Sequence, residues 1–377
     1  MSNYLWRNKI TFQAPTAAAL LWLALPSANA LPLRRTGQQR PDSVEQQSLE
    51  AFPILTYDTD VGFGYGGKIF LLGTLNAKES FDVTLFNSTK GERWYRLVFS
   101  IPDFELRQGT MYPLAFDVTI DYDKYLKANL FEPGNFSPPS PHETYTREPL
   151  EVSASGSRGF TRNFVATLGI KFKNVRSYYF AEQSRVLQLF PSLDFNKTHS
   201  LSLYTTVRFD TRNSFINPQH GSVFQIEFET ANRQYKSDFS FFRTTLTAEY
   251  FAEVFPRITL ASRVVFQNIS GSGIPLWAQS SLGGNNTLRG FPMDRFIDNG
   301  MSLLNGELRF PIFRRLGGVL FFDDGKVFNS YRSASIKGWH SNAGVGLRFY
   351  MDTFVVRFDI GVSNETTGVY FNFGHVF

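Results

Sequence analysis

Residues 282–300 read LGGNNTLRGFPMDRFIDNG, and this stretch differs in composition from the segments on both sides of it. Its glycines and asparagines are unfavourable in strands, so the sequence predicts a long loop here. At the centre of the loop Gly290 follows Arg289, which puts a flexible backbone beside a planar guanidinium that is always charged. The following segments carry carboxylates within alternating patterns, Glu307 in LLNGELRFP and Asp323 in GVLFFDDGKV.

We interpret this stretch as a loop that folds back into a β-barrel, where Glu307 and Asp323 hold Arg289. A guanidinium removed from water needs carboxylate partners, and a two-pronged pair also fixes its orientation. Asp324 is the weaker candidate, because neighbouring side chains of a strand point to opposite faces. The same divergence disfavours a metal site at Asp323 and Asp324. The alternative is a solvated surface loop whose arginine faces water, as charged loop residues commonly do.

Residues 1–30 have the features of a secretory signal peptide. Arg7 and Lys9 make the start basic, residues 17–25 are apolar, and the sequence Ala-Asn-Ala that ends at Ala30 matches a cleavage site. The apolar run is too short for a membrane-spanning helix, which needs about 20 residues. We therefore expect cleavage near Ala30, with an uncleaved anchor as the alternative.

The composition is rich in aromatic residues, which make up 16% of the chain and include 40 Phe and 16 Tyr. Aromatic-rich alternating strands without a helical span are typical of outer-membrane barrels, in which aromatic residues gather at both membrane interfaces. The absence of Cys excludes disulfides, iron–sulfur clusters and cysteine–zinc sites. A net charge of +5 without a basic block does not indicate nucleic-acid binding. We expect no cofactor and no bound metal.

Apolar and polar residues alternate with a period of two from Phe52 onward, which predicts about sixteen antiparallel strands. We therefore expect a short periplasmic segment at residues 31–51 and an all-β, transmembrane antiparallel barrel at residues 52–377. Long connections are expected at residues 126–149, 175–199 and 282–300 and near Ser335, and short turns near Gly159, Pro256, Pro311 and Met351. Because outer-membrane barrels have short periplasmic turns and long extracellular loops, both chain ends should lie in the periplasm.

A barrel in a membrane closes on itself, because hydrocarbon offers no partner for the backbone groups of an open sheet edge. Closure brings the first expected strand, Phe52–Tyr57, beside the last, Val369–Phe377. Pro53 lacks a backbone N–H and Gly374 weakens its strand, so we predict a poorly paired seam. The predicted seam residues are Phe52, Pro53, Leu55, Phe373, Gly374 and Phe377, with Phe371, Phe373 and Phe377 on one face of the last strand. The alternative is that Pro53 only marks the outer end of the first strand.

Four motifs resemble those of one known family. The sequence TLRGF, with Leu288, Arg289, Gly290 and Phe291, resembles the [VL]RG[FY] motif in the sixth extracellular loop of the BamA/TamA-type bacterial surface antigen superfamily. GELRFPIF is similar to that family's next strand, FFDDGKVF to its F-x-D-x-G-x-V-[WF] strand, and RFDTRNSFINPQHG to one of its turns. The motifs occur in the family's order over about half the chain.

The resemblance implies an outer-membrane barrel that inserts or translocates other proteins. The mechanism would be strand templating, in which the seam opens sideways and a substrate strand pairs with the exposed edge. The expected partners are outer-membrane lipids, lipopolysaccharide and unfolded outer-membrane or secreted proteins, and we expect a monomer. Family members usually carry polypeptide-transport-associated (POTRA) domains before the barrel, and residues 31–51 are too short to form one.

A passive diffusion channel or structural barrel is the alternative function. The loop distinguishes the two, since a loop that fills the lumen argues against a wide pore. A barrel hydrolase is a further alternative, because a catalytic triad can assemble across strands. None of the histidines lies in a G-x-S-x-G context, so we expect no enzymatic activity. The histidines are His142, His199, His220, His340 and His375.

Overall fold

The computed structural model describes most of the chain after residue 47. The described residues are 48–58, 62–75, 78–89, 91–139, 143–189, 197–330, 337–351 and 355–377. The predicted signal peptide, residues 1–30, and nearly all of the predicted periplasmic segment lie outside the described residues.

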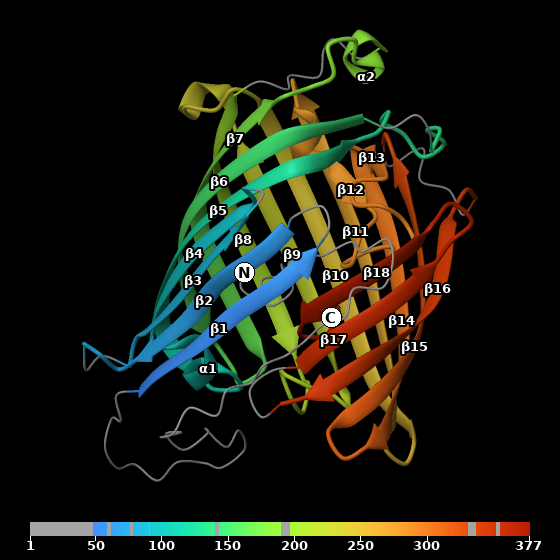
Figure 1. The fold of residues 1–377 in the computed structure, drawn as a ribbon. Coiled ribbons are helices and arrows are strands. Elements are labelled where there is room, and N and C mark those ends of the chain that lie inside the picture. Colours follow the sequence, from blue (N-terminus) through green and yellow to red (C-terminus); the bar gives the residue numbers. More distant parts are fainter. Residues whose placement is uncertain are drawn as a thin grey trace.

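Sixteen antiparallel strands form one sheet in which neighbours in the chain are neighbours in space. Figure 1 shows this sheet wrapped around a central space, with the colours running around the wall in chain order. The strands are β1 (Ser48–Asp58), β2 (Gly62–Leu72), β3 (Ser80–Ser88), β4 (Arg93–Ile101), β5 (Tyr112–Leu130), β6 (Glu143–Gly159), β7 (Phe164–Tyr178), β8 (Thr198–Asp210), β9 (Gly221–Ala231), β10 (Ser240–Phe255), β11 (Ile258–Ser272), β14 (Gly300–Phe313), β15 (Leu316–Phe328), β16 (His340–Tyr350), β17 (Val355–Val362) and β18 (Thr367–Phe373). The predicted all-β barrel of about sixteen strands is confirmed.

The barrel wall is polar inside and apolar outside, the reverse of a soluble protein. On β14 the side chains of Asn305, Glu307 and Arg309 are buried in the interior, whereas Leu304, next to Asn305, is 38% exposed on the outer surface. Because strand side chains alternate between the two faces, each strand contributes to both surfaces at once. An apolar outer band around a polar lumen is the arrangement that suits a barrel surrounded by lipid.

Two strands extend further than the sequence predicts. The expected loop at residues 126–149 is largely strand, because β5 continues to Leu130 and β6 begins at Glu143. The register shifts between Tyr125 and Ala128, and the two strands pair again from Ala128 to Leu130. The extension carries the wall beyond its neighbours and shortens the connecting loop, so the expected bounds of that loop were wrong.

Among the described residues, helices are few and short. α1 (Phe104–Arg107) follows β4, and α2 (Arg185–Leu189) lies at the opposite end of the barrel, beyond β7 (Figure 1). Single 3-10 turns occur at η3 (Arg233–Tyr235) and η4 (Leu276–Ala278). In the part of the chain that the structure describes, no helix has the length and apolar character needed to cross a membrane.

The long loop at residues 282–300 contains strand structure that the sequence did not predict. β12 (Ser280–Leu282) pairs with β13 (Phe296–Asp298) in a small separate sheet. Leu282 and Phe296 face each other in this pairing, and both are fully buried. Apolar packing between the two ends of the loop therefore outweighs the weak strand propensity of its glycine-rich middle.

The first strand is longer than expected. β1 begins at Ser48 rather than Phe52, and its ladder with β2 places Pro53 opposite Gly67, in the middle of the strand. Both the prediction of a short first strand and the alternative that Pro53 marks its outer end were therefore wrong. A proline within a strand is tolerated at a sheet edge, where its missing N–H costs no ladder bond. Residues 55–58 are described in their backbone only, so the side chain of Leu55 lies outside the described part.

The last strand is the short one. β18 ends at Phe373, where the expected strand continued to Phe377, and Gly374 follows with a φ of 83° that favours glycine. The bend turns the end of the chain inward, so that Phe377 packs against the buried Phe251 of β10. Phe377 therefore does not share a face with Phe371, as the alternating pattern had predicted. The side chain of Phe373 lies outside the described part.

Candidate functional site

The loop between β11 and β14 occupies the barrel lumen. Its motif residues Leu288, Arg289 and Phe291 have no solvent exposure. Leu288 and Phe291 belong to an apolar cluster that joins the loop to the inner wall, and whose other buried members are Val265, Leu282, Phe296, Leu303 and Val327. Burial of apolar surface against the wall helps to hold the glycine-rich backbone of the loop in one place.

The structure brings the three predicted site residues together. Arg289 Nε and Nη2 donate to the two carboxylate oxygens of Asp323 at 2.9 and 2.8 Å, a bidentate pair. Arg289 Nη1 donates to Glu307 Oε1 at 2.6 Å. The guanidinium carbon lies 3.5 Å from the ring centroid of Phe321, which covers one face of the group.

Arg289 remains charged in this setting. Burial disfavours its charged form, but the charges and hydrogen bonds of Asp323, Glu307 and Asp359 outweigh burial and raise the pKa of Arg289 above its usual range. Asp324 points to the other face of β15, where it accepts a hydrogen bond from Ser341 Oγ at 2.8 Å. The weaker rank that the sequence assigned to Asp324 agrees with this position.

The network is larger than the sequence predicted. Asp359 on β17 accepts from Arg289 Nη1 at 3.1 Å, and Arg348 on β16 bridges Asp359 and Glu307. The further members are Arg309, which pairs with Glu307, Arg357, which lies beside Asp359, and the amides of Asn305 and Asn342, which donate to Asp323. The sequence did contain a signal for these residues. Arg357 and Asp359 are charged residues two positions apart in an apolar strand, and Glu307 and Arg309 show the same spacing. Residues two apart on a strand share a face, so each pair is expected to face the lumen.

Glycines allow the loop to lie directly on the inner wall of the last strands. A Cβ atom at Gly290 would come within 2.6 Å of Asn342 Cβ, and one at Gly361 within 2.5 Å of the Arg289 carbonyl oxygen. Ser363 Oγ donates to the Gly290 carbonyl at 2.7 Å, and Tyr370 Oη donates to the Phe291 carbonyl at 3.2 Å. The loop backbone is therefore bonded to the β17–β18 hairpin.

Gly361→Ala tests this close approach. The added methyl group would overlap the backbone of Arg289, so we expect the loop to shift and the barrel to lose about 1–3 kcal/mol of stability. The measurement is the temperature at which the purified barrel changes from its folded to its unfolded mobility in SDS electrophoresis. Gly306→Ala is the matched control, because the nearest atom to its new Cβ is 3.8 Å away. Equal transition temperatures for the two variants would contradict the close packing.

The outer end of the loop is hydrogen-bonded to residues 131–139, which we call the lid segment. Gly134 N–H donates to the Ile297 carbonyl at 2.7 Å. Arg295 of the loop donates to Ser137 Oγ and to the Ser137 carbonyl, at 2.9 and 2.7 Å, and forms a bidentate pair with Glu365 at 2.6 and 2.9 Å. Glu365 lies in the turn between β17 and β18, so Arg295 joins the lid segment to the last hairpin.

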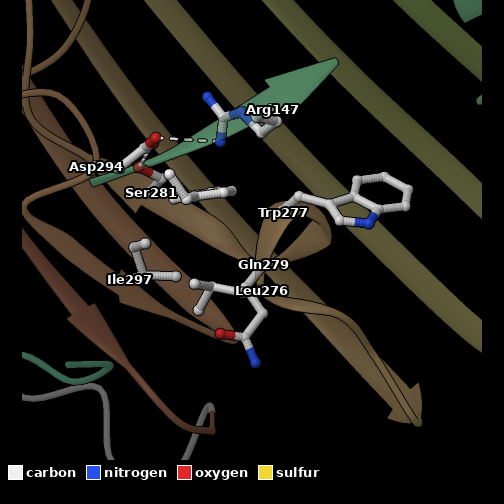
Figure 2. Close-up of a pocket in the computed structure, with 8 residues that line it drawn as sticks. Arg147, Leu276, Trp277, Gln279, Ser281, Asp294 and Ile297 are labelled. Carbon is white, nitrogen blue, oxygen red and sulfur yellow. Dashed lines mark hydrogen bonds and ion pairs between the residues drawn. The ribbon is translucent and has the colours of Figure 1, made fainter. Parts of the chain in front are cut away.

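A small pocket lies where the loop meets the wall at β6 (Figure 2). Figure 2 shows Arg147 of β6 directed at Asp294 of the loop, and their nearest charged atoms are 3.2 Å apart. Ser281 Oγ donates to the same carboxylate at 2.6 Å. Trp277 lies beside them, and its indole N–H donates to Thr198 Oγ1 of β8 at 2.7 Å. These bonds tie the outer half of the loop to the opposite wall.

Arg295→Ala should release the lid segment. The Arg295 side chain is 2% exposed, and removing it leaves Glu365 without its bidentate partner. We expect chymotrypsin to cleave the purified barrel at Phe136, which is 82% exposed, about tenfold faster than in the unaltered protein, because cleavage requires local opening. The control is Arg185→Ala, which removes a pair with Glu132 in the same segment but from a side chain that is 60% exposed. Equal cleavage rates would show that Arg295 does not hold the lid segment.

A sixteen-stranded barrel with an apolar exterior, and with a long loop bonded inside its lumen, defines a class of outer-membrane β-barrel. The family model for the Omp85 superfamily domain matches residues 72–377, and the chain belongs to this superfamily. The resemblance inferred from the TLRGF motif and its neighbours is thereby confirmed.

Solved structures with the same fold include BamA from Haemophilus ducreyi lacking POTRA domains 1-3, at 14% identity and a TM-score of 0.61. CdiB from Escherichia coli has 12% identity and a TM-score of 0.60, and CdiB from Acinetobacter baumannii has 14% identity and a TM-score of 0.52. The matches cover 87%, 88% and 86% of this chain, and 70%, 63% and 59% of those chains. At these identities the likeness concerns the fold. No curated protein matches the sequence.

Proposed function

We propose that this protein inserts or translocates other polypeptides at the outer membrane, by opening between β1 and β18 and pairing the exposed edge with a substrate strand. Membership of the Omp85 superfamily supports a role in assembly or translocation in general terms. One observation carries the finer proposal. Among the described residues, a hydrogen-bonded ladder joins each strand of the wall to the next, from β1 through to β18. No such ladder joins β1 to β18.

The lengths of the last strands support the same proposal. β17 has 8 residues and β18 has 7, whereas β14 and β15 have 14 and 13. A shorter strand offers fewer ladder bonds, each worth about 1 kcal/mol net in water and more in lipid. Pro53 in the middle of β1 adds support, because interior strands rarely contain proline.

The position of the loop disfavours the alternative of a passive diffusion channel. Residues of the loop with no solvent exposure, such as Arg289 and Phe296, lie inside the lumen that a wide pore would leave open. In our proposal the loop braces the lumen while the wall opens beside it. The proposed partners are membrane lipids and lipopolysaccharide around the outer surface, and unfolded outer-membrane or secreted proteins at the seam. The protein would act as a monomer and would make or break no covalent bond.

Depletion of the protein tests this role. Cells from which it is removed should lose one or more outer-membrane or surface proteins while their transcripts persist, because the missing step follows synthesis. Quantitative inventory of outer-membrane proteins before and after depletion is the measurement, and expression of the unaltered gene should restore the pattern. An unchanged inventory, combined with altered uptake of small solutes, would favour the channel function instead.

A further inference from the structure

The last four residues of the chain occupy a defined place on the inner wall. Gly374 N–H still donates to the Val355 carbonyl of β17 at 2.6 Å, and the chain then turns inward. His375 and Val376 are buried, at 8% and 2% exposure. The ring of Phe377 lies 6.2 Å, between centroids, from that of Phe251 on β10. We call residues 374–377 the tail.

Two arginines of the wall contact both the ring and the main chain of the tail. The guanidinium carbons of Arg263 on β11 and Arg309 on β14 lie 5.2 and 5.3 Å from the ring centroid of Phe377. Arg309 Nη2 donates to the main-chain oxygen of Phe377 at 3.1 Å, and Arg263 Nη1 donates to the Val376 carbonyl at 3.2 Å. The wall thus binds an aromatic ring together with the main-chain oxygens of two successive residues.

The wall holds these arginines in place without help from the tail. Arg309 Nε donates to Glu307 at 2.8 Å, and Arg263 donates twice to Asn305 Oδ1, at 3.0 and 2.7 Å. The Arg309 side chain is only 3% exposed, yet its Nη1 has no hydrogen-bond partner among the described residues. A preformed group with an unused donor can bind any extended chain that presents carbonyl oxygens at this point.

We propose that Arg263, Arg309 and Phe251 form a binding site for an extended polypeptide segment that carries an aromatic side chain. The tail fills this site in the structure and competes with other segments for it. The site recognises a ring and main-chain oxygens, so it tolerates many sequences around the aromatic residue. This inference deepens the proposed function. The natural occupant would be a substrate strand, because strands of membrane barrels are rich in aromatic residues. That identification rests on the proposed function.

Peptide binding to the purified, detergent-solubilised barrel tests the site apart from any insertion activity. The probe is a fluorescent peptide with the sequence of residues 372–377, Asn-Phe-Gly-His-Val-Phe, measured by fluorescence anisotropy. Phe377→Ala weakens the competing tail, so this variant should bind the probe about tenfold more tightly than the unaltered barrel. Phe371→Ala is the matched control, because it removes a ring from β18, the strand that precedes the tail, outside the site.

Two further measurements identify the site. A probe whose final phenylalanine is alanine should bind the Phe377→Ala barrel about tenfold more weakly, because it lacks the ring. The double variant Phe251→Ala with Phe377→Ala should also lose affinity for the original probe, with folding checked by electrophoretic mobility. Equal affinities of the Phe377→Ala and Phe371→Ala barrels, or of the two probes, would overturn the inference. Such a result would leave the proposed function intact, since opening of the seam is tested separately.

Discussion

Arg289→Ala should destabilise the barrel by about 3–5 kcal/mol, the cost of breaking a buried ion pair by removal of one partner. The carboxylate of Asp323 loses the most stabilisation, because its remaining described partners are the amides of Asn305 and Asn342 and the main-chain N–H of residue 289, none of which is charged. Glu307 keeps its ion pairs with Arg309 and Arg348 and therefore loses less stabilisation than Asp323. The expected result is a clear fall in the temperature at which the folded electrophoretic form disappears.

The same variant should also release the loop from the lumen, which single-channel conductance in a planar bilayer would report as a larger current. Arg162→Ala, in the exposed turn between β6 and β7, is the matched control for loss of an arginine. The double variant Arg289→Ala with Asp323→Asn should recover part of the lost stability, because it removes the unpaired carboxylate along with its partner. An Arg289→Ala barrel that unfolds at the temperature of the unaltered protein would show that the ion-pair network does not hold the loop.

A disulfide across the seam between β1 and β18 should abolish insertion or export of substrates, and reduction should restore it. The chain has no Cys, so introduced pairs are free of competing thiols. Leu55→Cys can be combined in turn with cysteines at positions 369, 371 and 373. A disulfide joins Cα atoms no more than about 7 Å apart, so the pair that oxidises also reports the register of the seam.

Phe358→Cys with Phe371→Cys is the matched control for the seam disulfide. These residues lie directly opposite each other in the ladder between β17 and β18, so their disulfide locks strands that are already paired. We expect this control to support normal outer-membrane composition when it replaces the depleted protein. If the locked seam does so as well, lateral opening is not the function, and the channel or structural alternative becomes the better explanation.

Much of the wall could be predicted from the sequence, because alternation between apolar and polar residues is a local property. The period-two pattern corresponds to each of the sixteen strands, and the aromatic content indicates the lipid-facing surface. The loop motif singled out Arg289, and the charged residues downstream singled out Glu307 and Asp323 as its partners. The structure brings these three residues together in the lumen.

The remaining members of the site depend on which strands lie side by side across the lumen. Asp359 and Arg348 are separated from Arg289 by 70 and 59 residues of chain, and only the curvature of the wall brings them into one network. No local pattern measures that curvature. The strand pattern also could not show that β5 and β6 continue past their neighbours, because extension depends on the partner strand.

The sequence by itself determined the class of fold, the number of strands, the position of the long loop and the arginine at its centre, because each depends on residues close together in the chain. Only the tertiary structure decided the ends of the sheet. There Pro53 lies within β1 rather than at its end, and Phe377 turns into the lumen instead of sharing a face with Phe371. The physical reason is that an edge strand has a ladder on one side only, and a residue beyond a bend has no ladder to fix its face. Its position then depends on distant partners, which for Phe377 are Phe251, Arg263 and Arg309.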